Sequence, residues 1–236
     1  MDKLIKAAFN DFRLIFRDNS LKVFLLLPLI TLPIIRFGLP YVIAIYDTLQ
    51  DYIGVILMLA SMQGSAVFGF IYSMVLVDEK DTSVGKVYGV LPISKFWFTT
   101  ARIVPPYLLA AASTFLLLLV EPFYDLPAGP IFVYSFLAGV VSPLMVIFVA
   151  TVASNKIEAM TWQKLFNIPL YLPIGSFFVP ASISPIFAVF PTYWSYLTLD
   201  SIIRGGSFTP SVVVGFVYSI LLTAILIRRF IRDHYQ

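Results

Sequence analysis

The residues best suited to binding chemistry gather in one polar interval, residues 78–94, of an otherwise apolar chain. Four charged residues open it without interruption: Asp78, Glu79, Lys80 and Asp81. Four apolar or aromatic residues follow at helical spacing: Val84, Val87, Tyr88 and Leu91. This pattern predicts a short amphipathic helix that begins with acidic residues, which the helix dipole favours, and ends at Pro92. Such a helix can dock onto a partner protein; a solvated loop between two membrane spans is the alternative.

Catalysis and metal binding have no comparable set of residues. The chain contains no cysteine, and its one histidine, His234, stands near the end of the sequence, where we expect it to be solvated. Gly85 and Lys86 lack the other residues of a P-loop, and no zinc-protease or serine-hydrolase motif occurs. We therefore predict no catalytic residue, no metal site and no cofactor in this chain.

Composition indicates the class of protein. Hydrophobic residues make up 59% of the 236 residues and charged residues only 12%, whereas roughly a quarter of a soluble domain is charged. A helical span needs about 20 apolar residues, which leaves room for about six spans with short connections. We predict an all-α polytopic membrane protein with a single transmembrane domain over residues 1–236. The basic residues do not cluster on a soluble face, which argues against nucleic-acid binding.

Residues 1–20 have the pattern of a helix that lies in the membrane interface. Its polar residues recur every three or four positions: Lys3, Lys6, Asn10, Arg13 and Arg17. Leucine, isoleucine and phenylalanine fill the opposite face. We expect the apolar face to enter the acyl chains and the basic face to meet anionic headgroups.

Six apolar stretches are predicted to cross the bilayer: residues 23–46, 53–77, 103–120, 131–152, a kinked fifth span from residue 165, and residues 212–227. Pro105 and Pro106 fall in the first turn of the third stretch, where missing amide donors are tolerated. Repeated prolines interrupt the chain after residue 165. They predict broken, re-entrant half-helices over residues 180–208, near the outer surface.

Arg36 and Gln63 are the polar side chains that could line a substrate path in the first two spans. Arg36 lies toward the outer half of its span, so the plainer interpretation is that its side chain extends to the headgroups. A secondary carrier usually needs an ionisable group at mid-membrane, and Arg36 is the only candidate.

Small residues repeat every four positions along the second span, at Ser61, Ser65, Gly69 and Ser73. Such a ladder lets another helix approach closely in lipid, so we predict a packing seam. The neighbour could be a helix of the same chain or one of a second copy.

Charge predicts the orientation. With six spans and a cytoplasmic N-terminus, every lysine and arginine except Arg36 and Arg204 falls on the inner side. This agrees with the positive-inside rule. We expect a multi-pass protein of the cell (plasma or inner) membrane with both termini in the cytoplasm.

The polar interval resembles the segment after the second span in the membrane subunits of type-2 ABC transporters. The residues that carry the resemblance are the Asp78–Asp81 run, Gly85, the run Leu91-Pro92-Ile93-Ser94, and Arg102 at the head of the third span. In that family the segment is a coupling helix that sits in a groove of the ATP-binding subunit. The resemblance implies a coupling segment over residues 78–95, an N-terminal elbow helix and a re-entrant pair between the last two spans.

These observations favour a permease subunit of an ATP-driven ABC exporter that carries a hydrophobic or amphipathic substrate, such as a drug-like molecule or a lipid. The expected partners are a P-loop ATP-binding subunit, which would hold ATP and Mg, and a second permease subunit, in a homo- or heterodimer. The alternative is a non-transport membrane scaffold or assembly factor without an ATPase partner. A stable complex without an ATPase would distinguish the scaffold from the exporter.

Overall fold

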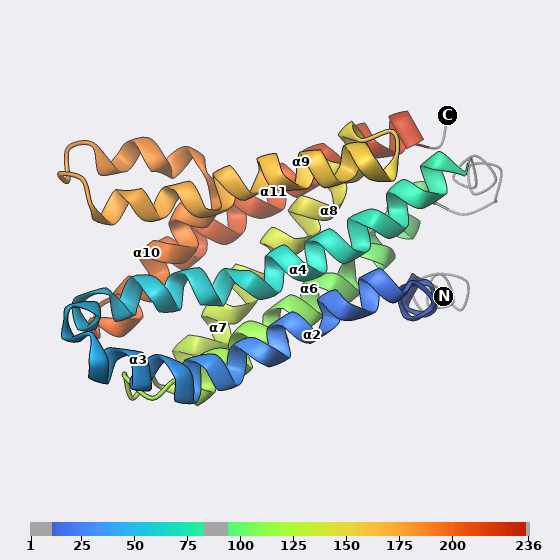
Figure 1. The fold of residues 1–236 in the computed structure, drawn as a ribbon. Helices are drawn as coiled ribbons and strands as arrows, with labels where there is room; N and C mark the ends of the chain where they lie inside the picture. Colours follow the sequence, from blue (N-terminus) through green and yellow to red (C-terminus); the bar gives the residue numbers. More distant parts are fainter. Residues whose placement is uncertain (1–10, 83–93, 235–236) are drawn as a thin grey trace.

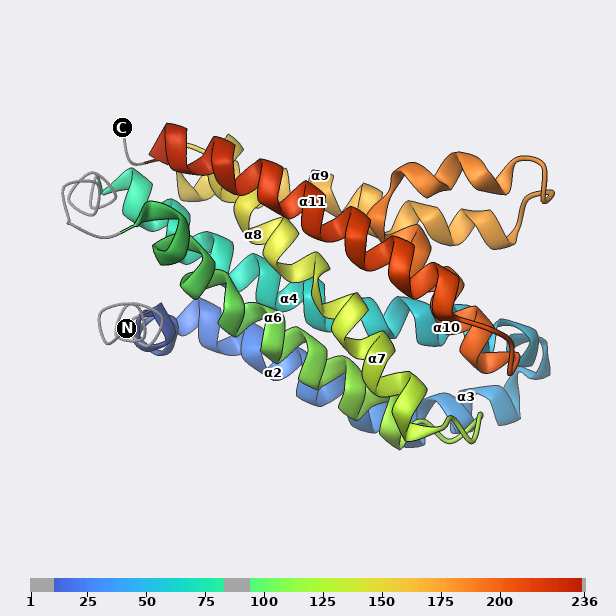
Figure 2. The same ribbon diagram turned by 180° about the vertical axis from the view of Figure 1, so that it is seen from behind.

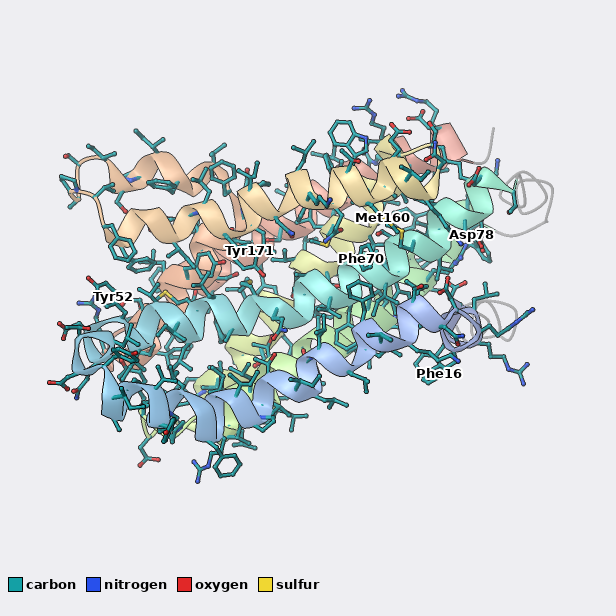
Figure 3. All side chains as sticks on the ribbon, in the orientation of Figure 1. Phe16, Tyr52, Phe70, Asp78, Met160 and Tyr171 are labelled. Carbon is teal, nitrogen blue, oxygen red and sulfur yellow. The ribbon has the colours of Figure 1, made fainter. Side chains whose placement is uncertain are left out.

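The computed structural model describes residues 11–82 and 94–234, and in these ranges the chain is helical (Figure 1). Phe16 and Asp78 lie at one end of the molecule and Tyr52 at the other (Figure 3). The end at which the helix over residues 11–17 and the last turn of α11 lie is called the basic end (Figures 1 and 2). Its basic residues include Arg13, Arg17, Lys80, Lys95, Lys156, Arg228, Arg229 and Arg232.

The first apolar stretch forms three helical segments in succession: α2 (Asn19–Pro33), the π-helix η1 (Ile34–Gly38) and α3 (Leu39–Ile45). It begins at residue 19 rather than 23 because the Asp18 carboxylate accepts hydrogen bonds from the amides of Ser20 (2.9 Å) and Leu21 (3.3 Å) and so caps α2. In the preceding helix, Ile15 is buried and the rings of Phe12 and Phe16 are exposed side by side.

The next two helices extend beyond the apolar stretches that predicted them. After η2 (Asp47–Tyr52), α4 runs from Ile53 to Asp81, and α6 runs from Lys95 to Val120. The prediction that the acidic run starts a separate helix is therefore wrong, because residues 78–81 form the last turn of α4. Pro105 and Pro106 lie inside α6 and not in its first turn. Both helices are longer because charged side chains near their ends bind each other, as described below.

The fourth stretch is two helices, α7 (Ala128–Gly139) and α8 (Val141–Val152), separated at Val140. Pro143 has no amide hydrogen to donate to the Gly139 carbonyl, which accounts for the break. Gly139 also allows close packing on α6: an added Cβ would lie 3.0 Å from the Ala111 Cβ and 3.1 Å from the Tyr107 carbonyl oxygen.

The chain then forms α9 (Lys156–Tyr171), the 3-10 helices η3 (Leu172–Phe177) and η4 (Ser184–Val189), α10 (Pro191–Ile203) and α11 (Thr209–His234). Pro173 cannot donate to the Pro169 carbonyl, and the Thr192 hydroxyl donates to it instead, at 3.0 Å. The Tyr196 hydroxyl donates to the next carbonyl, that of Leu170, at 2.8 Å. Side chains of α10 thus satisfy backbone groups that the break in α9 leaves open.

The all-helical expectation is confirmed for the described residues, and among them 5 helical stretches are long and apolar enough to cross a membrane. The α9–η3 stretch is not one of the 5. The stretch made by α7 and α8 is 78% buried in its apolar window and lies at the centre, whereas that of α2, η1 and α3 is 17% buried and lies at the edge (Figure 2). The first span therefore offers the largest unpaired apolar face of the spans.

We predict that Gly139→Ala destabilises the protein by about 1 to 3 kcal/mol, because the new methyl group would meet the Ala111 Cβ and two backbone atoms of α6, none of which can move aside by a side-chain rotation. Gly129→Ala on the same helix is the matched control, since an added Cβ there meets no heavy atom within 4 Å. The midpoint of denaturation in SDS, followed by tryptophan fluorescence, measures both. Equal midpoints for Gly139→Ala and the wild type would contradict the close approach.

Candidate functional site

A cluster of charged side chains at the basic end is centred on Arg102, which lies in the second turn of α6 and is 2% exposed. Its Nε and Nη2 atoms donate to the two carboxylate oxygens of Asp11, at 2.6 and 2.7 Å. Its Nη1 and Nη2 atoms donate to the two oxygens of Glu79, at 2.6 and 2.7 Å. One guanidinium thus binds two buried carboxylates, each through two hydrogen bonds.

This cluster joins three segments that are far apart in the sequence. Asp11 belongs to the helix over residues 11–17, Glu79 to the last turn of α4 and Arg102 to the start of α6. Burial raises the pKa of Asp11, and the charge and hydrogen bonds of Arg102 oppose that rise. The Asp11 carboxylate therefore depends on the guanidinium for its ionised form. The cluster fixes the spacing of the two helix ends that flank residues 83–93.

Lys80 and Asp78 connect the same turn of α4 to the corner between α8 and α9. The Lys80 ammonium donates to the carbonyls of Ala153 (2.7 Å) and Thr151 (3.3 Å), at the C-terminal end of α8. A cation is favourable there because the last carbonyls of a helix lack amide partners. Asp78 pairs with Lys156, the first residue of α9, at 2.8 Å.

The corner between α8 and α9 is held by its own capping hydrogen bonds. The Asn155 side chain accepts from the Glu158 amide at 2.9 Å, and the Glu158 carboxylate accepts from the Ser154 amide at 2.9 Å. This reciprocal arrangement caps the N-terminus of α9. The hydrogen bond from the Ser154 amide lowers the pKa of Glu158, so the carboxylate is charged at neutral pH. The corner is therefore an ordered part of the basic end.

The predicted docking residues fall into two groups. Asp78, Glu79 and Lys80 bind other parts of the chain, whereas Asp81 is exposed and forms no ion pair with any residue that the structure describes. The predicted apolar stripe, Val84, Val87, Tyr88 and Leu91, lies outside the described residues. Among the described residues, Asp81 is thus the member of the charged run without an ion pair inside the chain, and Asp78 is partly exposed.

The small-residue ladder of α4 packs against α7 and α8 of the same chain. The Ser61 hydroxyl shares a hydrogen bond with the Tyr134 hydroxyl (2.6 Å), and the Ser65 hydroxyl donates to the Ala138 carbonyl (2.7 Å). Gly69 faces Met145 so closely that an added Cβ would lie 2.6 Å from its sulfur. Ser73 is also buried and donates to the Phe70 carbonyl in its own helix. The seam is therefore used within the subunit.

Arg36 and Gln63, the two candidates for a substrate path, have different surroundings. The Arg36 guanidinium donates to the Val120 carbonyl, the last of α6, at 3.2 Å. Gln63 accepts a hydrogen bond from the Thr31 hydroxyl and so connects α4 to α2. The two side chains therefore bind different parts of the chain, and Arg36 caps the C-terminal end of α6.

The arrangement defines a multi-pass helical membrane protein whose helix ends are joined by buried charges at one end. A family model described as "Fluoroquinolones export permease protein Rv2686c-like" matches residues 11–227, and the chain belongs to this family of export permeases. The membership confirms the resemblance to permease subunits of ABC-type drug exporters. Comparisons with curated proteins and with solved structures gave no match.

We predict that Arg102→Gln costs about 3 to 5 kcal/mol of stability, because it leaves two carboxylates buried without a cation. Arg204→Gln is the control: Arg204 pairs with Asp200 at 2.9 Å, but its side chain is 73% exposed, so the loss should stay below about 1 kcal/mol. Denaturation in SDS compares the two variants. Similar losses of stability for the two variants would contradict the prediction that the buried ion pairs of Arg102 matter more than the exposed pair of Arg204.

Proposed function

We propose that the chain is the permease subunit of an ATP-driven exporter and is coupled to a separate P-loop ATPase at its basic end. The observation that carries this proposal is the charged cluster on both sides of residues 83–93, the interval in which the sequence predicts the coupling helix. A force applied there acts on α4 and α6, whose ends Glu79 and Arg102 hold together. Membership of an export-permease family supports the same role.

Coupling would proceed by rigid-body movement of the connected ends. Arg102 connects the N-terminal helix to α4 and α6, and Lys80 connects α4 to the corner between α8 and α9. Movement of the docked segment therefore carries parts of several spans with it. This chain would supply no cofactor; ATP and Mg would be bound and used in the ATPase subunit.

The proposed substrate is an amphipathic, drug-like molecule, in agreement with the fluoroquinolones in the family description. A second permease subunit, identical or related, would complete the path. The exposed face of the first span supports this partner, since Leu29, Ile34, Phe37 and Tyr41 are each more than half exposed. A scaffold role remains the alternative and predicts a complex without an ATPase.

The proposed topology has six spans, with α9 and η3 together forming the fifth and the basic end in the cytoplasm. The chain has no cysteine, so single cysteines can report the side of each loop. We predict that a membrane-impermeant maleimide labels Ser182→Cys, in the exposed turn between η3 and η4, in intact cells. Ser154→Cys, in the exposed corner before α9, should react only after permeabilisation. Labelling of both from the same side would exclude α9 and η3 as a span.

Asp81→Arg is predicted to weaken binding of the ATPase about tenfold, because a charge reversal in a docking surface places like charges together and ~1.4 kcal/mol is sufficient for that factor. Glu79 is unsuitable for this test, since its reversal would also break the contact with Arg102. Asp125→Arg, exposed in the loop after α6, is the control.

The measurement is the amount of P-loop ATPase that co-purifies with the protein from its native membrane in mild detergent. Equal retention by the wild type and Asp81→Arg would remove Asp81 from the docking surface. Purification of a stable membrane complex with no ATPase at all would favour the scaffold.

A further inference from the structure

A groove of about 300 Å³ lies between α6, α8 and α11. Figure 2 shows the course of these three helices. On α6 it is lined by residues at relative positions 0, 4, 7, 8 and 11, from Phe96 to Tyr107. On α11 the same spacing recurs from Phe216 to Ile227. Residues with this spacing form one continuous helix face, so two opposed faces make the walls and Pro143 of α8 lies at the floor.

The walls offer mainly hydrocarbon, and their polar groups are two threonine hydroxyls and the hydroxyl of Tyr107. The hydroxyls of Thr100 and Thr223 donate to carbonyls of their own helices, those of Phe96 (2.8 Å) and Ser219 (2.7 Å). Ordered water needs two or more polar partners, which these walls do not supply. The groove therefore suits an apolar chain better than water or a polar solute.

The length of the groove matches one leaflet of a bilayer. From Phe96 to Tyr107 a helix rises about 16 Å, and half of the hydrocarbon core is about 15 Å. The rims consist of exposed apolar residues, such as Val104 on α6 and Val217 on α11. Because the groove starts in the first turn of α6, at the basic end, it extends over the leaflet on that side.

Two basic residues stand next in sequence to the lining residues at the basic end of the groove. Lys95 precedes Phe96, and Arg228 follows Ile227 and lies one turn beyond Ala224 of the wall. Neither forms an ion pair with any residue in the described ranges, whereas Arg229 and Arg232 both lie next to Asp233. A positive charge near the headgroup layer attracts anionic lipid.

We propose that this groove binds one anionic phospholipid, with an acyl chain between α6 and α11 and the headgroup phosphate against Lys95 and Arg228. The inference goes beyond the proposed function and does not depend on an ATPase partner. The lipid would fill the gap between the two helices and connect the start of α6, which carries Arg102, to the end of α11.

The test is native mass spectrometry of the purified full-length protein after exchange into phosphatidylglycerol or phosphatidylcholine. We expect one retained phosphatidylglycerol per chain and weaker retention of phosphatidylcholine. Arg228→Gln should lower phosphatidylglycerol retention about fivefold, the effect of one basic residue near a headgroup. Arg229→Gln, its exposed neighbour, is the matched control and should retain the lipid as the wild type does.

A second pair of variants tests the acyl chain. Ala224→Phe fills the groove and should abolish retention of the lipid, whereas Ile225→Phe, at an exposed position outside the groove, should not. Equal retention of the two lipids, or equal effects of Arg228→Gln and Arg229→Gln, would overturn the proposal. So would displacement of the lipid by a fluoroquinolone in the wild type, because the groove would then be a site for cargo.

Discussion

Arg102 is 2% exposed, so its guanidinium depends on protein groups for both its hydrogen bonds and its charge balance. Asp11, 91 residues away in the sequence, and Glu79, 23 residues away, each supply both carboxylate oxygens. The need of Arg102 for two carboxylates explains three features. The helix α4 continues past its apolar residues, α6 begins before its apolar residues, and the N-terminal helix lies against both. Without the guanidinium, this end would hold two buried carboxylates that repel each other.

The rest of the bundle depends on how closely α4 can approach its neighbours. In lipid there is little hydrophobic force between helices, and small residues with short hydrogen bonds provide the association. Ser61, Ser65 and Gly69 place α4 against α7 and α8, and Gly139 places α7 against α6. These contacts use the small-residue seams inside the subunit, and the first span is left with an apolar outer face for lipid or a second subunit.

Local patterns in the sequence were enough to predict the helical fold, most of the spans and the breaks after residue 165, because apolar periodicity and proline act on neighbouring residues. They could not reveal the cluster around Arg102. Asp11 has the same local pattern as a solvated residue of an interfacial helix, and only a contact 91 residues away distinguishes it. Glu79 and Lys80 were assigned to docking because they precede apolar residues at helical spacing and belong to a run that resembles a coupling segment. The one available signal was that Arg102 begins an apolar stretch and needs a counter-charge.

The charged run is divided: Glu79 and Lys80 bind other parts of the chain, whereas Asp81 is exposed. This division suits the proposed coupling element. If Asp78 to Asp81 all faced a partner, loss of the partner would leave the helix ends free to separate. Glu79 is bound to Arg102, so separating α4 from α6 would break this buried ion pair. Breaking a buried ion pair costs about 3 to 5 kcal/mol. Moving both ends together keeps every contact of the cluster and avoids that cost. The buried pair therefore favours rigid-body movement of the two helices in the proposed coupling, in which Asp81 would contact the ATPase.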